Sequence, residues 1–142
     1  MTAQTHVTIT RVLQAPIERV FAAWTDPALM ARWFFPVPAW TAEVENDLAV
    51  GGRYTIRMYT GEPEPTVMTG VYQSIERPTR LVFTWNSHAI VDTLVTIELR
   101  DLGGMTELTL THERLVEAAT RELTTSGWAG CLDSLDRYLA AA

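Results

Sequence analysis

The sequence contains almost no cysteine and no long apolar run. Its single cysteine, Cys131, excludes an internal disulfide and any zinc site built from several cysteines. No segment approaches the ~18 consecutive apolar residues that a membrane-spanning helix needs. The N-terminal residues also lack the basic start and apolar stretch of a signal peptide. We therefore expect a cytoplasmic protein without a membrane span.

Basic residues and the usual cofactor motifs are scarce too. The chain has 11 Lys and Arg against 17 Asp and Glu, which gives a formal net charge of −6. Nucleic acids and anionic membranes both favour a basic surface, so neither is an expected partner. The three histidines, His6, His88 and His112, lack metal-ligand spacing, and the chain has no phosphate loop or dinucleotide fingerprint. We expect no metal and no cofactor.

What the chain does have is the composition of one globular domain. It has 142 residues, of which 47% are hydrophobic and 20% charged. A chain of this length can bury one substantial core, and little would remain for a second. We expect a single domain over residues 1–142.

Hydrophobic periodicity divides the chain into a strand, two short helices, a meander of strands and a final helix. An apolar face with helical spacing begins at Ala15-Pro16, and Asp26 can cap a second short helix through about Trp33. A long amphipathic helix is predicted from about Glu117 to Ala140. Its Gly127 and Gly130 suggest either a close packing partner or a kink. The predicted strands are Thr5–Leu13, Trp40–Asn46, Arg53–Tyr59, Thr66–Glu76, Arg80–Trp85, Val91–Asp101 and Met105–His112.

The connections between these strands are too short for helical crossovers, so the sheet should be antiparallel. Its one hidden face should be covered by the long final helix, which leaves space for a cavity between them. Alternation predicts the residues that face this helix: Tyr54, Ile56 and Met58; Leu81, Phe83 and Trp85; Thr93, Val95, Ile97 and Leu99; Leu108, Leu110 and His112. In the strand at 66–76, Val67, Val71 and Ile75 compete with Met68, Gly70 and Tyr72 for the inward face.

His112 and the aromatic loop around Pro36 are the other candidates for function. A lone inward histidine is either a satisfied core residue or a group that orients a ligand or transfers a proton. Trp33, Phe34, Phe35 and Trp40 surround the loop, where they could form a pocket mouth or belong to the core. A homodimer through this loop is a further alternative. Cys131 is expected to be a buried apolar residue.

Several short motifs, in this order, carry a family resemblance: Ala15-Pro16, then Trp24-Thr25-Asp26-Pro27, Trp33-Phe34-Phe35-Pro36, Gly51-Gly52, Gly70-x-Tyr72, Leu81-Val82-Phe83-Thr84-Trp85, Gly103-Gly104 and Gly127-Trp128. Together they resemble the SRPBCC superfamily, which is START-like and has the helix-grip fold. Within it they resemble the branch related to activators of the heat-shock-protein-90 ATPase. The resemblance implies an α+β fold in which a seven-stranded, curved antiparallel sheet wraps around a long C-terminal helix, with two short helices between strands 1 and 2. It implies a cavity for a small, largely apolar ligand and no fixed catalytic residues.

Three functions follow as hypotheses. The first is binding of a small apolar or aromatic molecule. The second is an enzyme of cyclase, dehydratase or hydrolase type on such a ligand, with His112 as general acid or base and Tyr72 or Tyr54 orienting a carbonyl. The third is a co-chaperone acting on a heat-shock-protein-90-type ATPase. The expected ligand-binding residues are Trp33, Phe34, Trp40, Tyr54, Ile56, Met58, Tyr72, Phe83, Trp85, Val95, Leu110, His112, Trp128 and Leu132.

Overall fold

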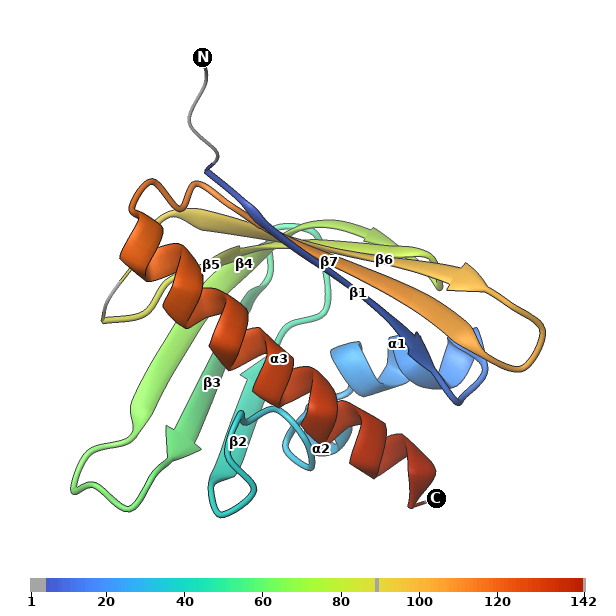
Figure 1. The fold of residues 1–142 in the computed structure, drawn as a ribbon, viewed down its shortest axis with the longest axis horizontal. Helices are drawn as coiled ribbons and strands as arrows, with labels where there is room; N and C mark the ends of the chain where they lie inside the picture. The colour runs from blue at the N-terminus through green and yellow to red at the C-terminus, as the bar shows by residue number, and fades with distance from the viewer. Residues whose placement is uncertain (1–4, 89, 142) are drawn as a thin grey trace.

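Alternating apolar residues build one antiparallel sheet, and the two helical regions pack on its concave side (Figure 1). The computed structural model describes residues 5–88 and 90–141. The elements are β1 (Val7–Leu13), α1 (Ile17–Thr25), α2 (Pro27–Met30), β2 (Thr41–Asn46), β3 (Arg53–Tyr59), β4 (Thr66–Glu76), β5 (Arg80–Trp85), β6 (Thr93–Asp101), β7 (Thr106–Glu113) and α3 (Ala118–Ala140). The predicted α+β helix-grip fold is confirmed.

The seven strands follow the order β1-β7-β6-β5-β4-β3-β2, with every neighbouring pair antiparallel. The first strand therefore pairs with the last one, and β1 and β2 form the two edges. Five hairpin connections account for the rest of the order. In the β6–β7 turn, Gly103 and Gly104 have φ of 79° and 98°, a backbone region that only glycine enters readily.

The short helical region differs in length from its prediction. Asp26 caps α2 as expected, because its carboxylate accepts a hydrogen bond from the Ala28 N–H at 2.9 Å. The helix ends at Met30 rather than near Trp33. The chain continues through Trp33 in tight turns, in which the Trp33 N–H donates to the Met30 carbonyl at 3.2 Å. The indole N–H of Trp33 donates to the Ala23 carbonyl at 2.8 Å, which ties this turn to α1.

The predicted strand faces are confirmed by burial. The inward residues expected on β3, β5, β6 and β7 are all buried. On β4 the structure decides between the two alternatives: Met68, Gly70 and Tyr72 are buried. The register then shifts by one residue between Tyr72 and Ser74, so that Ile75 packs against the core as well. Each alternative is thus correct for one part of the strand.

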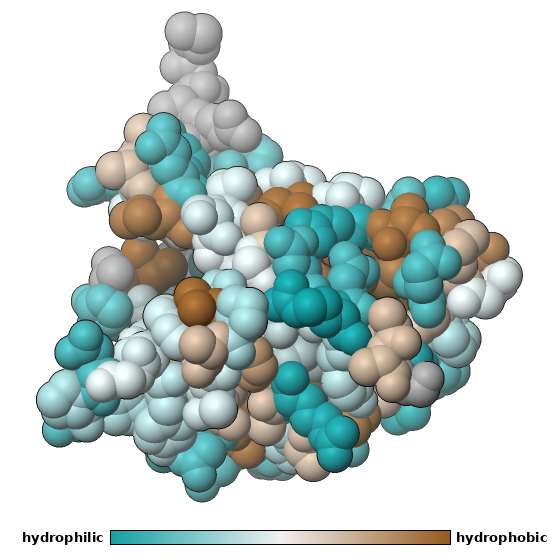
Figure 2. All heavy atoms as spheres, turned by 60° about the horizontal axis from the view of Figure 1, so that its bottom comes forward, coloured by the Kyte–Doolittle hydropathy of each residue, from teal (hydrophilic) through white to brown (hydrophobic). Residues whose placement is uncertain are grey.

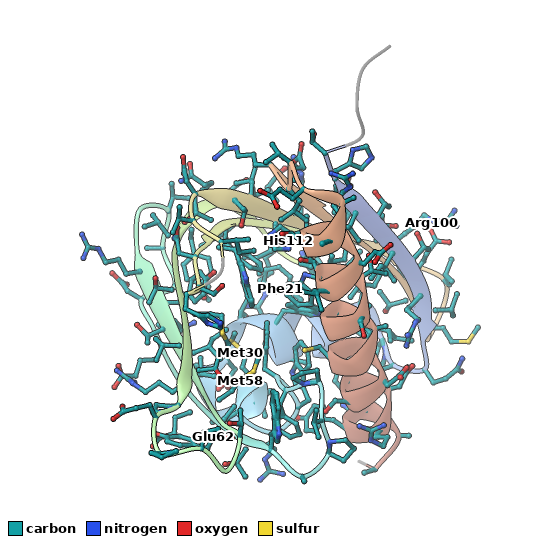
Figure 3. The ribbon with its side chains drawn as sticks, turned by 60° about the vertical axis from the view of Figure 1, so that its left-hand side comes forward. Phe21, Met30, Met58, Glu62, Arg100 and His112 are labelled. Atoms are coloured by element: carbon teal, nitrogen blue, oxygen red, sulfur yellow. The ribbon has the colours of Figure 1, made fainter. Side chains whose placement is uncertain are left out.

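The long helix α3 crosses the concave face of the sheet and lies beside β1 (Figure 1). Figure 3 shows Met58 and His112 directed into the space between sheet and helix, whereas Glu62 and Arg100 lie on the outside. Arg11 of β1 fastens the C-terminal half of the helix. Its guanidinium contacts Asp133 at 2.8 Å, Asp136 at 3.3 Å and the Ala129 carbonyl at 3.4 Å.

Candidate ligand-binding pocket

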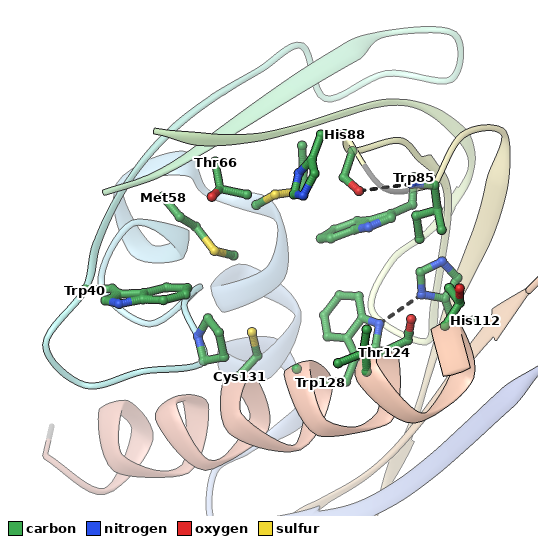
Figure 4. Close-up of a pocket in the computed structure, with 16 residues that line it drawn as sticks. Trp40, Met58, Thr66, Trp85, His88, His112, Thr124, Trp128 and Cys131 are labelled. Atoms are coloured by element: carbon green, nitrogen blue, oxygen red, sulfur yellow. Dashed lines mark hydrogen bonds between the residues drawn. The ribbon is translucent and has the colours of Figure 1, made fainter. Parts of the chain in front are cut away.

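A pocket of about 300 Å³ lies between α3 and the sheet, near the N-terminal part of the helix (Figure 4). In the space-filling view one flank of the molecule is hollowed, and hydrophobic residues are visible inside the hollow (Figure 2). The walls come from the loop after α2, from β3, β4, β5 and β7, from the β5–β6 connection and from α3. The lining residues are Pro36, Trp40, Met58, Thr66, Met68, Trp85, Ser87, His88, Ile90, His112, Thr120, Leu123, Thr124, Gly127, Trp128 and Cys131.

The structure divides the expected ligand-binding residues into two groups. Trp40, Met58, Trp85, His112 and Trp128 line the pocket. The others are buried in the packed core instead: Trp33, Phe34, Tyr54, Ile56, Tyr72, Phe83, Val95, Leu110 and Leu132. The space among the core aromatics is a void of about 10 Å³, which has room for one water molecule at most.

The aromatic loop is divided in a similar way. Trp33 and Phe34 are less than 2% exposed, and they stack on each other with ring centroids 4.7 Å apart. Their burial leaves them no surface to offer a second copy of the chain. Pro36 and Trp40 line the pocket, whereas Phe35 is half-buried and points to a different groove, described below.

The largest share of the lining that the strand pattern did not indicate comes from α3. Thr120, Leu123, Thr124, Gly127 and Cys131 lie on one helix face together with Trp128. Threonines and a glycine do not form an apolar stripe, so hydrophobic periodicity does not indicate this helix face. The i, i+3, i+4, i+7 spacing of Thr120, Leu123, Thr124 and Gly127 was the signal that could have found it.

The two glycines of α3 have different surroundings: one allows a close packing contact and the other borders open space. A Cβ atom at Gly130 would lie 2.6 Å from the Pro36 carbonyl oxygen, so this position permits the close packing that the sequence suggested. Around a Cβ at Gly127, the described part of the chain places no atom within 4 Å. Gly127 therefore adds free volume to the pocket, and it is not a packing contact.

His112 is fully buried and fixed by a chain of hydrogen bonds that joins α3 to the sheet. The indole N–H of Trp128 donates to His112 Nδ1 at 3.0 Å. On the other side, His112 Nε2 lies 2.8 Å from Thr93 Oγ1, and that hydroxyl donates to the Trp85 carbonyl at 2.6 Å. Because an indole nitrogen only donates, Nδ1 must be the acceptor and Nε2 carries the proton. The three hydrogen bonds thus point the same way: Trp128 donates to His112, His112 to Thr93, and Thr93 to the Trp85 carbonyl.

This arrangement keeps the imidazole neutral. Burial lowers the pKa of His112 to about 4, and protonation of Nδ1 would break the hydrogen bond from Trp128. Both ring nitrogens already have partners within the protein. The rings that contact His112 belong to Trp85 and Trp128, at centroid distances of 6.0 and 6.2 Å. The geometry therefore favours a positioning role over proton transfer.

The two tyrosines considered as partners of His112 lie deeper in the core. The Tyr54 hydroxyl donates to the Thr84 carbonyl, and the Tyr72 hydroxyl accepts a hydrogen bond from the Asn46 amide at 3.0 Å. Burial raises the pKa of both phenols above the ordinary value. Both hydroxyls make hydrogen bonds within the folded core, and neither residue lines the pocket.

The pocket has a neutral lining. Of the described residues that form it, none is an aspartate, glutamate or arginine. Burial raises the pKa of the Cys131 thiol to about 12, so this group stays protonated and unreactive at neutral pH. Thr66, Ser87, His88, Thr120 and Thr124 supply the polar groups. A charged ligand would lose its hydration without a compensating ion, which favours an uncharged one.

The described ranges 5–88 and 90–141 hold no group of three or more His, Cys, Asp or Glu side chains that could bind a metal ion. No helix within them is long and apolar enough to cross a membrane.

A curved sheet that grips one long helix, with a pocket between them, defines the START-like class of the helix-grip fold. Within this class the chain belongs to the family described as Activator of Hsp90 ATPase homolog 1-like protein, whose family model matches residues 14–140. The resemblance inferred from the sequence motifs is thereby confirmed.

Solved structures agree with this assignment. A protein from Chromobacterium violaceum is 28% identical, with a TM-score of 0.86 over 96% of this chain and 98% of that chain. An AHSA1-like protein from Aeromonas hydrophila is 27% identical, with a TM-score of 0.80 over 95% of this chain and 93% of that chain. A protein from Rhodobacter sphaeroides is 27% identical, with a TM-score of 0.84 over 96% and 93%. No curated protein matches the chain.

Proposed function

We propose that the protein binds a small, uncharged, flat apolar molecule in the pocket between α3 and the sheet. The observation that carries this proposal is the lining itself: three indole rings, two methionines and a glycine that leaves space, with no formal charge among the described lining residues. Its volume of about 300 Å³ is at the lower end of the range typical of small-molecule sites.

Hydrogen bonding supports the idea that the walls are preorganised. Trp128 is held by His112, and Trp85 contacts Trp128 with ring centroids 5.0 Å apart. These two rings form one fixed corner of the pocket, on which a planar molecule can stack. Leu123 is 76% exposed at the opening, and it offers apolar surface that a bound ligand would cover.

The experiment is a titration with a neutral aromatic probe such as 1-aminonaphthalene, followed by quenching of tryptophan fluorescence. Gly127→Leu places a side chain in the free volume and should weaken binding at least tenfold. Ser126→Leu is the matched control, because the same side chain on the adjacent, exposed position points away from the pocket. Equal binding by wild type and Gly127→Leu would remove the pocket from consideration.

The family description gives a second candidate, stimulation of an Hsp90-type ATPase. Such a co-chaperone would act through its surface and would not need an open pocket. Purified Hsp90 ATPase should therefore be assayed with wild type and with Gly127→Leu. Equal stimulation by both proteins would place the function on the exterior, whereas no stimulation by wild type leaves ligand binding as the supported function.

A further inference from the structure

We propose that a second site, on the opposite side of the loop after α2, binds a small aromatic anion such as an aryl phosphate or carboxylate. The site is an open groove of about 440 Å³ between that loop and the C-terminal part of α3. It is lined by Arg32, Phe35, Pro38, Ser134, Arg137 and Tyr138. None of these six residues lines the pocket described above.

The charge of the groove differs from that of the whole molecule. Although the chain carries a formal net charge of −6, the only ionised side chains lining this groove are the guanidinium groups of Arg32 and Arg137. Most other arginines are neutralised: Arg11, Arg57, Arg77, Arg80, Arg100 and Arg114 each form an ion pair. Within the described residues, Arg32 and Arg137 have no carboxylate within 4 Å. Two uncompensated guanidinium groups facing one opening favour an anion.

A third polar group in the groove also lacks a partner. Ser134 is only 5% exposed, and it is among the groove-lining residues. Its hydroxyl makes no hydrogen bond to any described residue. This hydroxyl is not fully enclosed, so it is open to the groove and can donate to a molecule that binds there. An anion held by the two arginines could accept this hydrogen bond.

The end of α3 does not oppose an anion here. The carbonyls of a helix C-terminus carry partial negative charge, which would repel one. Arg19 offsets this charge, because its guanidinium donates to the Leu139 carbonyl at 2.9 Å. The same guanidinium lies 5.8 Å from the ring centroid of Tyr138, although Arg19 itself does not line the groove.

The remaining walls are apolar and aromatic. Phe35 and Tyr138 are half-buried, and Pro38 is exposed beside them. Ring faces and a proline favour a flat apolar body attached to the anionic group. The class of ligand is therefore a ring that carries phosphate or carboxylate, and a neutral ring belongs to the other pocket.

Phenyl phosphate is the probe for this site, with affinity measured at pH 7.5 by NMR titration of 15N-labelled protein. We expect saturable shifts at the groove residues and an affinity that falls as NaCl is raised. Arg32→Gln and Arg137→Gln should each weaken binding at least fivefold, and Ser134→Ala should weaken it two- to threefold. Thermal melting of each variant checks that it is folded.

Arg53→Gln is the matched control, because Arg53 is an exposed arginine of β3 that also lacks a carboxylate within 4 Å among the described residues. It should bind phenyl phosphate as the wild type does. Equal weakening by Arg53→Gln, or no weakening by either groove arginine, would overturn the proposal in favour of general attraction to basic side chains. Inorganic phosphate that binds as tightly as phenyl phosphate would overturn the aromatic part of it.

Discussion

The two halves of α3 differ sharply in how they are held. From Trp128 onward the helix buries six side chains, and Arg11 and Arg19 fasten it to β1 and α1. From Ala118 to Gly127 none of its residues, all of which the structure describes, is buried. The first half covers the pocket and the second half completes the core. One continuous helix thus combines a stabilising segment with a segment that contributes pocket lining and little core packing.

The largest expected effect is the loss of stability when a side chain of the packed half is truncated. Leu135→Ala in the packed half should lower the free energy of unfolding by about 3 kcal/mol, because Leu135 is fully buried. Leu123→Ala in the covering half should change it by less than about 0.5 kcal/mol, because Leu123 is mostly exposed. Urea denaturation of both variants measures the contrast. Similar losses for the two would show that the first half also belongs to the folded core.

The next effect is pH dependence at the junction between the halves, where Trp128 meets His112. Since the pKa of His112 is lowered from 6.5 to about 4 by folding, the unfolded chain binds the proton first as the pH falls. The contribution of this group to stability is complete above pH 6.5 and is lost between pH 6.5 and 4. At about 1.4 kcal/mol per pH unit, the loss approaches roughly 3 kcal/mol.

Unfolding free energies of wild type and His112→Gln, measured from pH 7.5 to 4, test this. At pH 7.5 the variant is expected to have a lower free energy of unfolding than the wild type. Between pH 6.5 and 4 its free energy of unfolding should fall less steeply. His6→Gln is the control, because His6 is exposed. Parallel curves for wild type and His112→Gln would show that the imidazole does not carry the dependence.

The two glycines sharpen the comparison at a smaller scale. Gly127→Ala should stabilise the protein by about 0.5–1 kcal/mol, because alanine favours the helix and its Cβ meets free volume. Gly130→Ala should destabilise it by about 1–3 kcal/mol, because its Cβ would overlap with Pro36. Opposite signs of the change in melting temperature are the decisive result, and equal signs would contradict this account of the helix.

An effect as small as that of Gly127→Ala is expected from the ion pairs of the packed half. Arg11→Met should cost about 0.5–1 kcal/mol, because Asp133 and Asp136 are substantially exposed and solvent screens them. Methionine keeps much of the apolar stem that packs beneath the helix. Raising the NaCl concentration should reduce the difference between wild type and Arg11→Met, and a difference independent of salt would point to lost packing instead.

The fold was predictable because alternation specifies strand faces strongly. Tyr54, Ile56 and Met58, or Leu108, Leu110 and His112, occupy their faces as a period of two requires. The shift after Tyr72 was not visible, because a bulge alters the register without a distinctive residue type. Likewise α2 ended early because turn hydrogen bonds around Trp33 replaced helical ones.

The pocket was only partly predictable. Parity identifies inward residues but not where packing fills the interior and where it leaves space. Phe34 and Tyr72 pack tightly with their aromatic neighbours, whereas Trp40 and Met58 face the opening. This outcome depends on how side chains from distant elements fit together, and a sequence pattern does not contain that information.

Gly70 shows how much of this architecture depends on one missing side chain. A Cβ there would fall 1.9 Å from the Thr84 carbonyl oxygen and 2.5 Å from the ring of Tyr54, its partner across the strands. At the neighbouring position the Val71 N–H donates to the Thr84 hydroxyl, so the regular ladder between β4 and β5 is interrupted beside Gly70. Such a break lets a sheet bend instead of lying flat. A hydrogen atom in place of a methyl group thus helps to give the sheet the concavity into which the helix fits.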